Sequence, residues 1–283
     1  MRFLITGASG WIGFALTKHL SNIYGKKNLQ LILPPKSLHE KEEGRRKILF
    51  KEKYDIILND LLEEDIKIEK IKPFDVLYHL AAYTEVESKS KKVHVNDIGT
   101  EKLLNSLREL LKGKRVVFTG SILSIDRKYP DNKPLSENSQ CNPKTEYGKT
   151  KLKGEFFIKK YADICNFDWI ILRIPTVYGP GFRPGGMFGV IPRNLKKNSL
   201  ATMLPWPGKL SVVYLEDTVK ALVFLGVKKV KCNDIYHISS GENPAFDYMN
   251  NQIAQINNIK RKSIKVPGFF WNLTRFIVWF PGL

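Results

Sequence analysis

A tyrosine and a lysine four residues apart are the side chains of this chain best suited to moving a proton. They stand in the stretch Tyr147-Gly-Lys-Thr-Lys151, which opens a predicted helix that runs to about Cys165. Residues four apart share one face of a helix, so the phenol and the amine point the same way. A phenol has a pKa of about 10, too high for easy proton exchange at neutral pH, and an ammonium one turn away lowers it. The same spacing also occurs on solvated helix faces, so the surrounding elements decide between the two interpretations.

A serine could hold a substrate oxygen beside this pair while the proton moves. The apolar run Val116-Val117-Phe118 predicts a strand from Arg115 to Thr119, and Thr119-Gly-Ser121 closes it. A hydroxyl is a suitable hydrogen-bond donor to such an oxygen. Ser121 is therefore the third candidate for an acid–base site.

A glycine-rich loop at the start of the chain predicts a phosphate-binding turn. Phe3, Leu4 and Ile5 suit a buried strand, and Gly7, Gly10 and Gly13 follow at the spacing G-x-x-G-x-x-G. Glycines permit a sharp turn, a close approach of backbone N–H groups to a pyrophosphate, and tight packing of the next helix. That helix, expected from Trp11 to Tyr24, would direct its positive end at the same phosphates. The loop favours a dinucleotide, whose oxidised nicotinamide ring would further favour the phenolate of Tyr147.

The elements that must position these residues alternate between strand and helix. Strands are expected at Leu29 to Leu33, Tyr54 to Asn59 and Val76 to Leu80, and leucines at helical spacing predict one long helix from about Lys92 to Leu111. Further segments predict a helix at 188–197, a strand at 210–214, a helix at 216–225, a strand at 235–238 and a helix at 245–256. The order indicates a doubly wound, mostly parallel α/β sheet of the Rossmann type, with a small C-terminal α/β lobe.

The end of the second strand bears on the choice of cofactor. An Asp or Glu there would bind the adenosine ribose of NAD, but the chain has Pro34-Pro35-Lys36, followed later by Arg45-Arg46. The absence of this acid and the presence of nearby cations favour NADP, which carries an extra phosphate on that ribose, with NAD as the alternative.

Composition excludes several other classes of protein. Of 283 residues, 43% are hydrophobic, enough for a substantial core. The chain has no long uncharged apolar run, so a soluble, cytoplasmic protein is expected. Its three cysteines and five histidines show no disulfide or metal-ligand spacing, so no metal site is predicted.

The net charge of +18 favours anionic partners. The lysines are scattered rather than collected in one tract, which favours a solvated surface and no specific nucleic-acid partner.

An ordered series of motifs carries a family resemblance. The matching residues are Gly7-Ala-Ser-Gly10-Trp-Ile-Gly13, Asp60-Leu61, Leu80-Ala81-Ala82, Asn96 with Gly99-Thr100, Thr119-Gly-Ser121, Tyr147-x-x-x-Lys151, Leu172-Arg-Ile-Pro-Thr-Val-Tyr-Gly-Pro-Gly181 and Val213-Tyr-Leu-Glu-Asp217. The chain thus resembles the extended short-chain dehydrogenases/reductases, in the group called the NAD-dependent epimerase/dehydratase family.

The resemblance implies a role for each matching residue. Tyr147 would be the general acid/base, Lys151 would bind the nicotinamide ribose and lower the phenol pKa, and Ser121 would polarise the substrate C–O bond. The cofactor-binding residues implied, besides Tyr147 and Lys151, are Gly7, Ser9, Gly10, Trp11, Ile12, Gly13, Asp60, Leu61, Leu80, Ala81, Ala82, Thr119, Pro175 and Val177. The resemblance also implies a homodimer through the helix that begins at Tyr147 and the one before it.

Two departures from the family pattern narrow the expected function. Dehydratases of the family place an Asp-Glu pair directly after the serine or threonine, where this chain has Ile122-Leu123. Nucleotide-sugar epimerases commonly carry an arginine near position 210, where this chain has Lys209-Leu210. Arg183, Arg193 or Lys209 could neutralise a diphosphate instead.

The expected function is hydride transfer at a secondary alcohol or ketone with NAD or NADP. A nucleotide-sugar 4-epimerase or 4-ketoreductase is the first hypothesis, and a dehydratase is not expected. One alternative is a reductase or dehydrogenase of an apolar ketone, of the 3β-hydroxysteroid or dihydroflavonol type. Another is a non-enzymatic nucleotide- or RNA-binding regulator on the same fold.

Residues 1–180, with contributions from about 209–240, are expected to form the dinucleotide-binding domain, and 181–283 mainly a substrate-binding lobe. The aromatic segment from Val266 to Leu283 has two open interpretations: packing on that lobe, or peripheral contact with a membrane.

Overall fold

The computed structural model describes residues 1–37, 39–85, 90–125, 134–182, 186–268 and 271. These fall into two compact units. The first contains the described residues of Met1–Arg127, Leu135–Ile174 and Leu215–Ile238, and the second those of Lys128–Pro134, Pro175–Tyr214 and Ser239–Leu283. Most of the predicted C-terminal aromatic segment lies outside the described residues.

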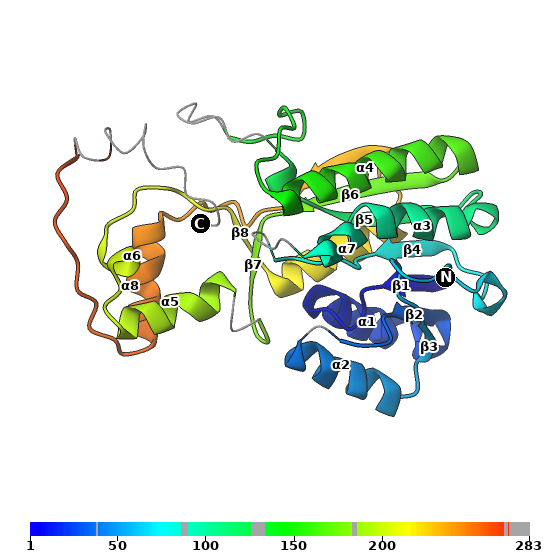
Figure 1. Cartoon of the computed structure of the whole chain (residues 1–283), viewed down its shortest axis with the longest axis horizontal. Coiled ribbons are helices and arrows are strands. Elements are labelled where there is room, and N and C mark those ends of the chain that lie inside the picture. The colour runs from blue at the N-terminus through cyan, green and yellow to red at the C-terminus, as the bar shows by residue number, and fades with distance from the viewer. Residues whose placement is uncertain (38, 86–89, 126–133, 183–185, 269–270, 272–283) are drawn as a thin grey trace. The chain divides into compact units, whose positions relative to one another are not determined.

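A seven-stranded parallel sheet forms the centre of the first unit (Figure 1). Its strands are β1 (Phe3–Thr6), β2 (Leu29–Leu33), β3 (Asp55–Leu58), β4 (Val76–His79), β5 (Arg115–Ser121), β6 (Asp168–Ile174) and β9 (Asp234–His237). The order is β3-β2-β1-β4-β5-β6-β9, and every neighbouring pair is parallel. The order reverses between β1 and β4, and ligands of such sheets bind outside the carboxyl ends of the strands at that point. The predicted doubly wound α/β sheet is confirmed.

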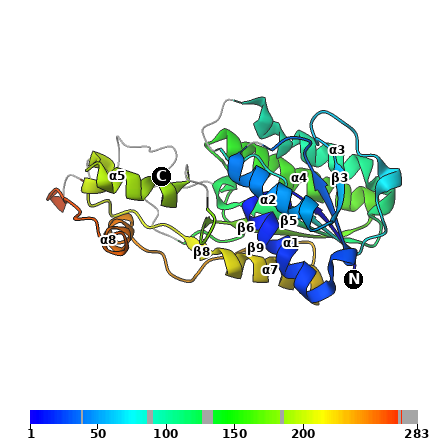
Figure 2. The same ribbon diagram turned by 90° about the horizontal axis from the view of Figure 1, so that it is seen from below.

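Helices cover both faces of this sheet (Figures 1 and 2). The helices of the unit are α1 (Trp11–Tyr24), α2 (Glu40–Lys51), α3 (Ile98–Ser106), α4 (Glu146–Cys165) and α7 (Leu215–Val227). On one face α1 packs beside α7, and on the other α3 packs beside α4. Strands β1, β2 and β4 are buried along their whole length, as expected where helices cover a parallel sheet on both sides.

The predicted long helix from Lys92 to Leu111 is wrong. The segment forms a 3₁₀ turn η3 (Lys91–Val95), helix α3, and a second 3₁₀ turn η4 (Arg108–Leu110). The break lies at Asn96, whose side chain bonds the backbone of Tyr83 instead of staying on a helix surface. Four of the leucines at helical spacing are still buried in the main core, namely Leu103, Leu104, Leu107 and Leu111, whereas Leu110 in η4 is exposed.

The second unit is smaller and contains its own two-stranded sheet. Strands β7 (Thr176–Tyr178) and β8 (Val212–Tyr214) pair in parallel, and the helices are α5 (Met187–Lys196), α6 (Leu200–Met203) and α8 (Phe246–Ile256). Arg261 holds the unit together, because its guanidinium donates to the carbonyl oxygens of Thr202 and Leu204 and to Asn251 Oδ1. Among the described residues of the whole chain, no helix is both long and apolar enough to cross a membrane.

Candidate active site

The glycine loop has a shape that only glycine allows. Gly7 has a φ of +74°, and a Cβ atom there would lie 2.6 Å from Ala81 N and from Leu80 C. A Cβ at Gly13 would lie 2.1 Å from the carbonyl oxygen of Gly7. The loop is therefore pressed against the end of β4 on one side and the start of α1 on the other.

The start of α1 leaves N–H groups for an anion. The helix is capped by Gly10, which has no side chain to bond them, and no acidic residue lies in the first turn. The first N–H groups of a helix have no partner within it, and the helix dipole adds positive charge at this end. A helix start with a glycine cap and no acidic side chain in its first turn fits the pyrophosphate of a dinucleotide.

The segments that carry Tyr147 and Ser121 meet at a close backbone contact between their neighbours Gly148 and Leu123. Ser121 ends β5 and begins the 3₁₀ turn η5 (Ile122–Ser124), where its Oγ accepts the N–H of Leu123 at 3.1 Å. A Cβ at Gly148 would lie 2.3 Å from the carbonyl oxygen of Leu123. The turn that follows Ser121 thus lies directly against the first turn of α4, which carries the half-buried Tyr147.

Lys151 lies in the interior, one turn along α4 from Tyr147. Its side chain is 1% exposed, and its Nζ lies 4.1 Å from the centroid of the Phe118 ring. Burial lowers the pKa of Lys151 to about 7, although the carboxylate of Glu155 opposes the shift. An amine with this pKa gains and loses a proton readily at neutral pH.

His79 lies at the end of β4 and is buried and neutral. Its Nδ1 is 2.7 Å from Thr6 Oγ1 and its Nε2 is 2.9 Å from Thr100 Oγ1. Burial, followed by the charge of Lys151, lowers the pKa of His79 to about 3. Thr100 Oγ1 donates its own proton to the carbonyl oxygen of Asn96 at 2.9 Å. It therefore accepts the proton on Nε2, and Nδ1 accepts the hydroxyl proton of Thr6.

The hydrogen bonds continue from Asn96 to the first turn of α4. Asn96 Nδ2 donates to Thr150 Oγ1 at 3.1 Å, and Thr150 Oγ1 donates to the carbonyl oxygen of Tyr147 at 3.0 Å. Buried polar groups with satisfied partners fix the elements that carry them. An unbroken series of hydrogen bonds therefore joins Thr6, next to the glycine loop, to Tyr147.

A buried ion pair joins α4 to strand β6, two turns along α4 from Tyr147. Arg173 on β6 donates to Glu155 on α4 through Nε at 3.0 Å and Nη2 at 2.8 Å, and each side chain is 2% exposed. Burial works to lower the pKa of Arg173, but the hydrogen bonds and charge of Glu155 outweigh it and raise the pKa. A Cβ at Gly120 would lie 2.8 Å from Glu155 Oε1, so the carboxylate occupies the space beside β5 that a side chain would need.

The remaining predicted cofactor residues divide between the two units. Ala81 N donates to Thr6 Oγ1 at 3.2 Å, and Thr119 Oγ1 donates to the carbonyl oxygen of His79 at 3.4 Å. Ser9, Gly10, Trp11, Ile12, Leu80 and Ala82 also lie in the loop, at the start of α1 or directly after β4. Pro175 and Val177 belong to the second unit.

Asp60 and Leu61 directly follow β3. The carboxylate of Asp60 accepts the N–H of Leu62 at 2.9 Å. The side chain of Leu61 is 5% exposed and packs in the main core.

Sequence reasoning missed the supporting residues His79 and Glu155 and the contacts of Glu42 with the glycine loop. Ser9 Oγ donates to Glu42 Oε1 at 2.8 Å, and Arg45 Nε donates to the carbonyl oxygen of Ser9 at 2.7 Å. No local spacing signals such contacts, because the partners are separated by 33 and 36 positions.

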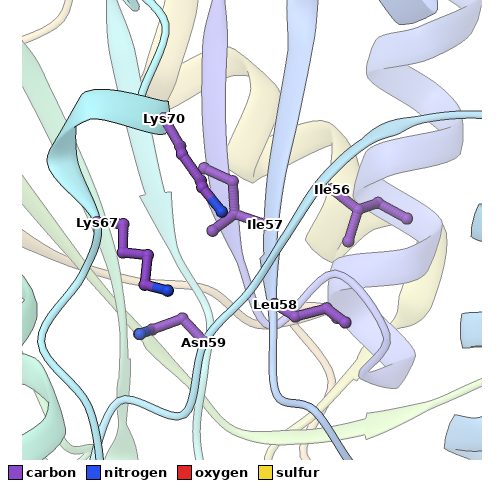
Figure 3. Close-up of a pocket in the computed structure, with 6 residues that line it drawn as sticks. All are labelled: Ile56, Ile57, Leu58, Asn59, Lys67 and Lys70. Atoms are coloured by element: carbon purple, nitrogen blue, oxygen red, sulfur yellow. The ribbon is translucent and has the colours of Figure 1, made fainter.

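A cavity of about 260 Å³ lies elsewhere in the first unit, on the edge strand β3 (Figure 3). It is lined by Ile56, Ile57, Leu58, Asn59, Lys67 and Lys70. Figure 3 shows the two lysine side chains extending towards β3 from the 3₁₀ turn η2 (Ile68–Lys70) and the residue before it. None of the predicted site residues lines this cavity.

Comparisons with known proteins agree with this architecture. A UDP-glucose 4-epimerase of Mycolicibacterium smegmatis is 30% identical over 200 residues, which cover 68% of this chain and 61% of that protein. A putative UDP-glucose 4-epimerase of Methanocaldococcus jannaschii is 29% identical over 266 residues, covering 89% of this chain and 82% of that protein. A dTDP-D-glucose 4,6-dehydratase of Dictyostelium discoideum is 28% identical, covering 84% of this chain and 58% of that protein.

Among solved structures, a UDP-glucuronic acid 4-epimerase from Bacillus cereus, in complex with UDP-glucuronic acid and NAD, has the same fold. Its TM-score is 0.77 at 22% identity, covering 95% of this chain and 88% of that one. Residues 3–239 match the family described as the NAD dependent epimerase/dehydratase family. Most of the chain is thus accounted for by one family, and the protein belongs to the NAD-dependent epimerase/dehydratase enzymes of the extended short-chain dehydrogenase/reductase type.

Proposed function

We propose that this chain moves hydride between a nicotinamide cofactor and a secondary alcohol or ketone of a nucleotide sugar, as a 4-epimerase or a 4-ketoreductase. The observation that carries the proposal is the arrangement on α4. Lys151, whose pKa is lowered to about 7 by burial, follows Tyr147 by one turn of α4. The turn η5, which directly follows Ser121, packs against the helix turn that bears Tyr147. Nucleotide-sugar 4-epimerases among the relatives support the choice of substrate class.

The side chains would divide the work of proton transfer. When bound, the cofactor supplies a hydride acceptor and donor at nicotinamide C4. Ser121 Oγ, oriented by the Leu123 N–H at 3.1 Å, would donate its hydroxyl proton in a hydrogen bond to the substrate oxygen. Tyr147 Oη would take the proton from the substrate hydroxyl as the hydride leaves the carbon, and would return it in the reverse step. Lys151 would favour the phenolate whenever its amine is protonated.

A dehydratase is not proposed, although one relative carries that name. Eliminating water requires an acid and a base of its own beside the serine. Ile122 and Leu123 stand at these two positions and form the turn that packs on α4. Neither side chain can donate or accept a proton, which supports epimerisation or reduction instead.

The alternative substrate, an apolar ketone, gains no support from Leu210. Leu210 stands where related epimerases carry an arginine, and its side chain is 9% exposed within a small core with Val212 and Met249. Packing in the second unit therefore accounts for a leucine here, and it need not line an apolar substrate pocket. The RNA-binding alternative rests on net charge alone.

We also expect a homodimer through α3 and α4. Phe156 and Ile164 lie on α4 eight residues apart and are 61% and 54% exposed, and Ile98 at the start of α3 is 44% exposed. Side chains two turns apart share one face of a helix, so α4 presents an apolar surface that a second copy could cover.

The test is to incubate the purified protein with UDP-glucose, UDP-glucuronic acid, UDP-N-acetylglucosamine and dTDP-glucose, with NAD or reduced NADP added. Proton NMR of the recovered sugars distinguishes a 4-epimer, a 4-keto sugar and unchanged substrate. A 4-epimer, or a 4-keto sugar formed with added NAD as the reverse of 4-keto reduction, supports the proposal. If the protein converts none of the four sugars but does convert a steroid ketone or a dihydroflavonol, it is a reductase or dehydrogenase of apolar ketones instead.

A further inference from the structure

The chain lacks an Asp or Glu at the end of β2, where such an acid would hydrogen-bond the adenosine ribose of the cofactor. We infer that Glu42, on the first turn of α2, supplies that acid and makes the site select NAD over NADP. The inference rests on the dinucleotide binding contained in the proposed function.

Two hydrogen bonds join α2 to the glycine loop at a single residue. Ser9 Oγ donates to Glu42 Oε1 at 2.8 Å, and Arg45 Nε donates to the carbonyl oxygen of Ser9 at 2.7 Å. Ser9 lies between Gly7 and Gly10, which form the proposed pyrophosphate cradle, and it is fully buried. Glu42 is half-buried, so its carboxylate stands between the loop and the solvent. A carboxylate of α2 thus reaches the glycine loop, whereas the residues directly after β2 are two prolines and a lysine.

The chemistry of a carboxylate suits ribose hydroxyls and opposes a phosphate. Its two oxygens accept about four hydrogen bonds, so a bond from Ser9 leaves capacity for the ribose. The additional phosphate of NADP carries a charge of about −1.5 to −2 at neutral pH, and like charges a few ångströms apart repel each other.

The two arginines that favour NADP in the sequence are engaged with the protein. Arg45 bonds Ser9, and the charge of Glu42 opposes the lowering of the Arg45 pKa by burial. Arg46 Nη1 donates to the carbonyl oxygen of Pro35 and lies 3.9 Å from Glu43. Glu42 therefore offsets the charge of Arg45, which bonds the glycine loop, and Arg46 faces Glu43 and Pro35 instead.

Binding constants test this assignment without reference to turnover. Isothermal titration of nucleotide-free protein gives Kd for NAD and for NADP. The variants are Glu42→Gln and the matched control Glu43→Gln, which removes the same charge from the next residue of α2 but faces Arg46. Thermal melting without ligand shows whether each variant is folded.

The wild type is expected to bind NAD at least about tenfold more tightly than NADP. Glu42→Gln should reduce that preference at least about threefold, by weakening NAD and strengthening NADP, and Glu43→Gln should leave it unchanged. The double variant Glu42→Gln/Arg45→Gln should lose the tighter NADP binding of Glu42→Gln, because it lacks the Arg45 guanidinium that could bind the extra phosphate.

Three results would overturn the inference. One is a wild-type preference for NADP, and another is a preference that Glu42→Gln and Glu43→Gln change equally, as a merely structural role of Glu42 would give. In both cases dinucleotide binding survives and only the role of Glu42 fails. Binding of neither dinucleotide would overturn the inference together with the proposed function.

Discussion

Gly148 of α4 and Leu123 of η5 touch through their backbones: a Cβ at Gly148 would lie 2.3 Å from the carbonyl oxygen of Leu123. This contact sets the spacing between the strand end that bears Ser121 and the helix turn that bears Tyr147. An acid–base site needs such spacing held to a fraction of an ångström, because proton transfer depends on hydrogen-bond geometry.

Gly148→Ala should therefore impair both stability and turnover. The methyl group forces η5 and α4 apart, with a loss of about 1–3 kcal/mol in the free energy of unfolding. Urea denaturation and sugar-nucleotide turnover measure the two effects. Gly44→Ala is the matched control, since Gly44 lies within α2 and a Cβ there meets nothing within 4 Å. Its stability should stay equal or rise by up to about 1 kcal/mol. Equal behaviour of the two variants would contradict the role of this contact.

Lys151→Met should make the protein more stable at neutral pH but inactive. Since the folded-state pKa is lowered from 10.5 to about 7, the buried amine destabilises the fold fully below pH 7. The penalty falls as the pH rises from about 7 towards 10.5, where the amine is neutral in both states. The variant should be more stable than the wild type at pH 7 by roughly 1–4 kcal/mol, by less at pH 10, and inactive. Denaturant titrations at both pH values test the sign, and a variant less stable at pH 7 would refute it.

His79 should make the protein sensitive to acid. Its pKa is lowered from 6.5 to about 3 by burial and by Lys151, so the unfolded chain binds a proton that the folded chain excludes. Stability contributed by the neutral ring is complete above pH 6.5 and is lost as the pH falls towards 3. His79→Gln keeps an acceptor and a donor but cannot be charged, so its unfolding free energy should fall less steeply between pH 6.5 and 4. An unchanged slope in the variant, measured by urea denaturation across this pH range, would refute this role of His79.

The pair of Arg173 and Glu155 should show strong coupling. Arg173→Met leaves the carboxylate of Glu155, 2% exposed, without its guanidinium. The expected loss is about 3–5 kcal/mol, because an uncompensated buried charge is costly. The double variant Glu155→Leu/Arg173→Met removes both charges and should recover much of the loss. A double-mutant cycle measured by denaturation gives the coupling, and additive losses would show that the two side chains act independently.

Local patterns in the sequence were enough to predict the glycine loop, the strands around it and helix α4. The strand after Phe118 continues to Ser121, two residues beyond the prediction, because β5 pairs with β6 along its whole length. Segment 92–111 was predicted wrongly, since the leucine periodicity indicates burial and gives no sign of the hydrogen bond between Asn96 and Tyr83 at the break between η3 and α3. Burial of Lys151 and Leu210 was equally invisible to spacing rules, because it depends on elements far away in the sequence.

Tyr147→Phe tests the central claim most directly, because it deletes one hydroxyl and keeps the ring. The measurement compares the rate of sugar-nucleotide conversion with the Kd for NAD, in the wild type and in the variant. The predicted result is a rate at least about 100-fold lower with NAD affinity changed less than about threefold. A variant that converts the sugar at the wild-type rate would contradict proton transfer by Tyr147 and the function built on it.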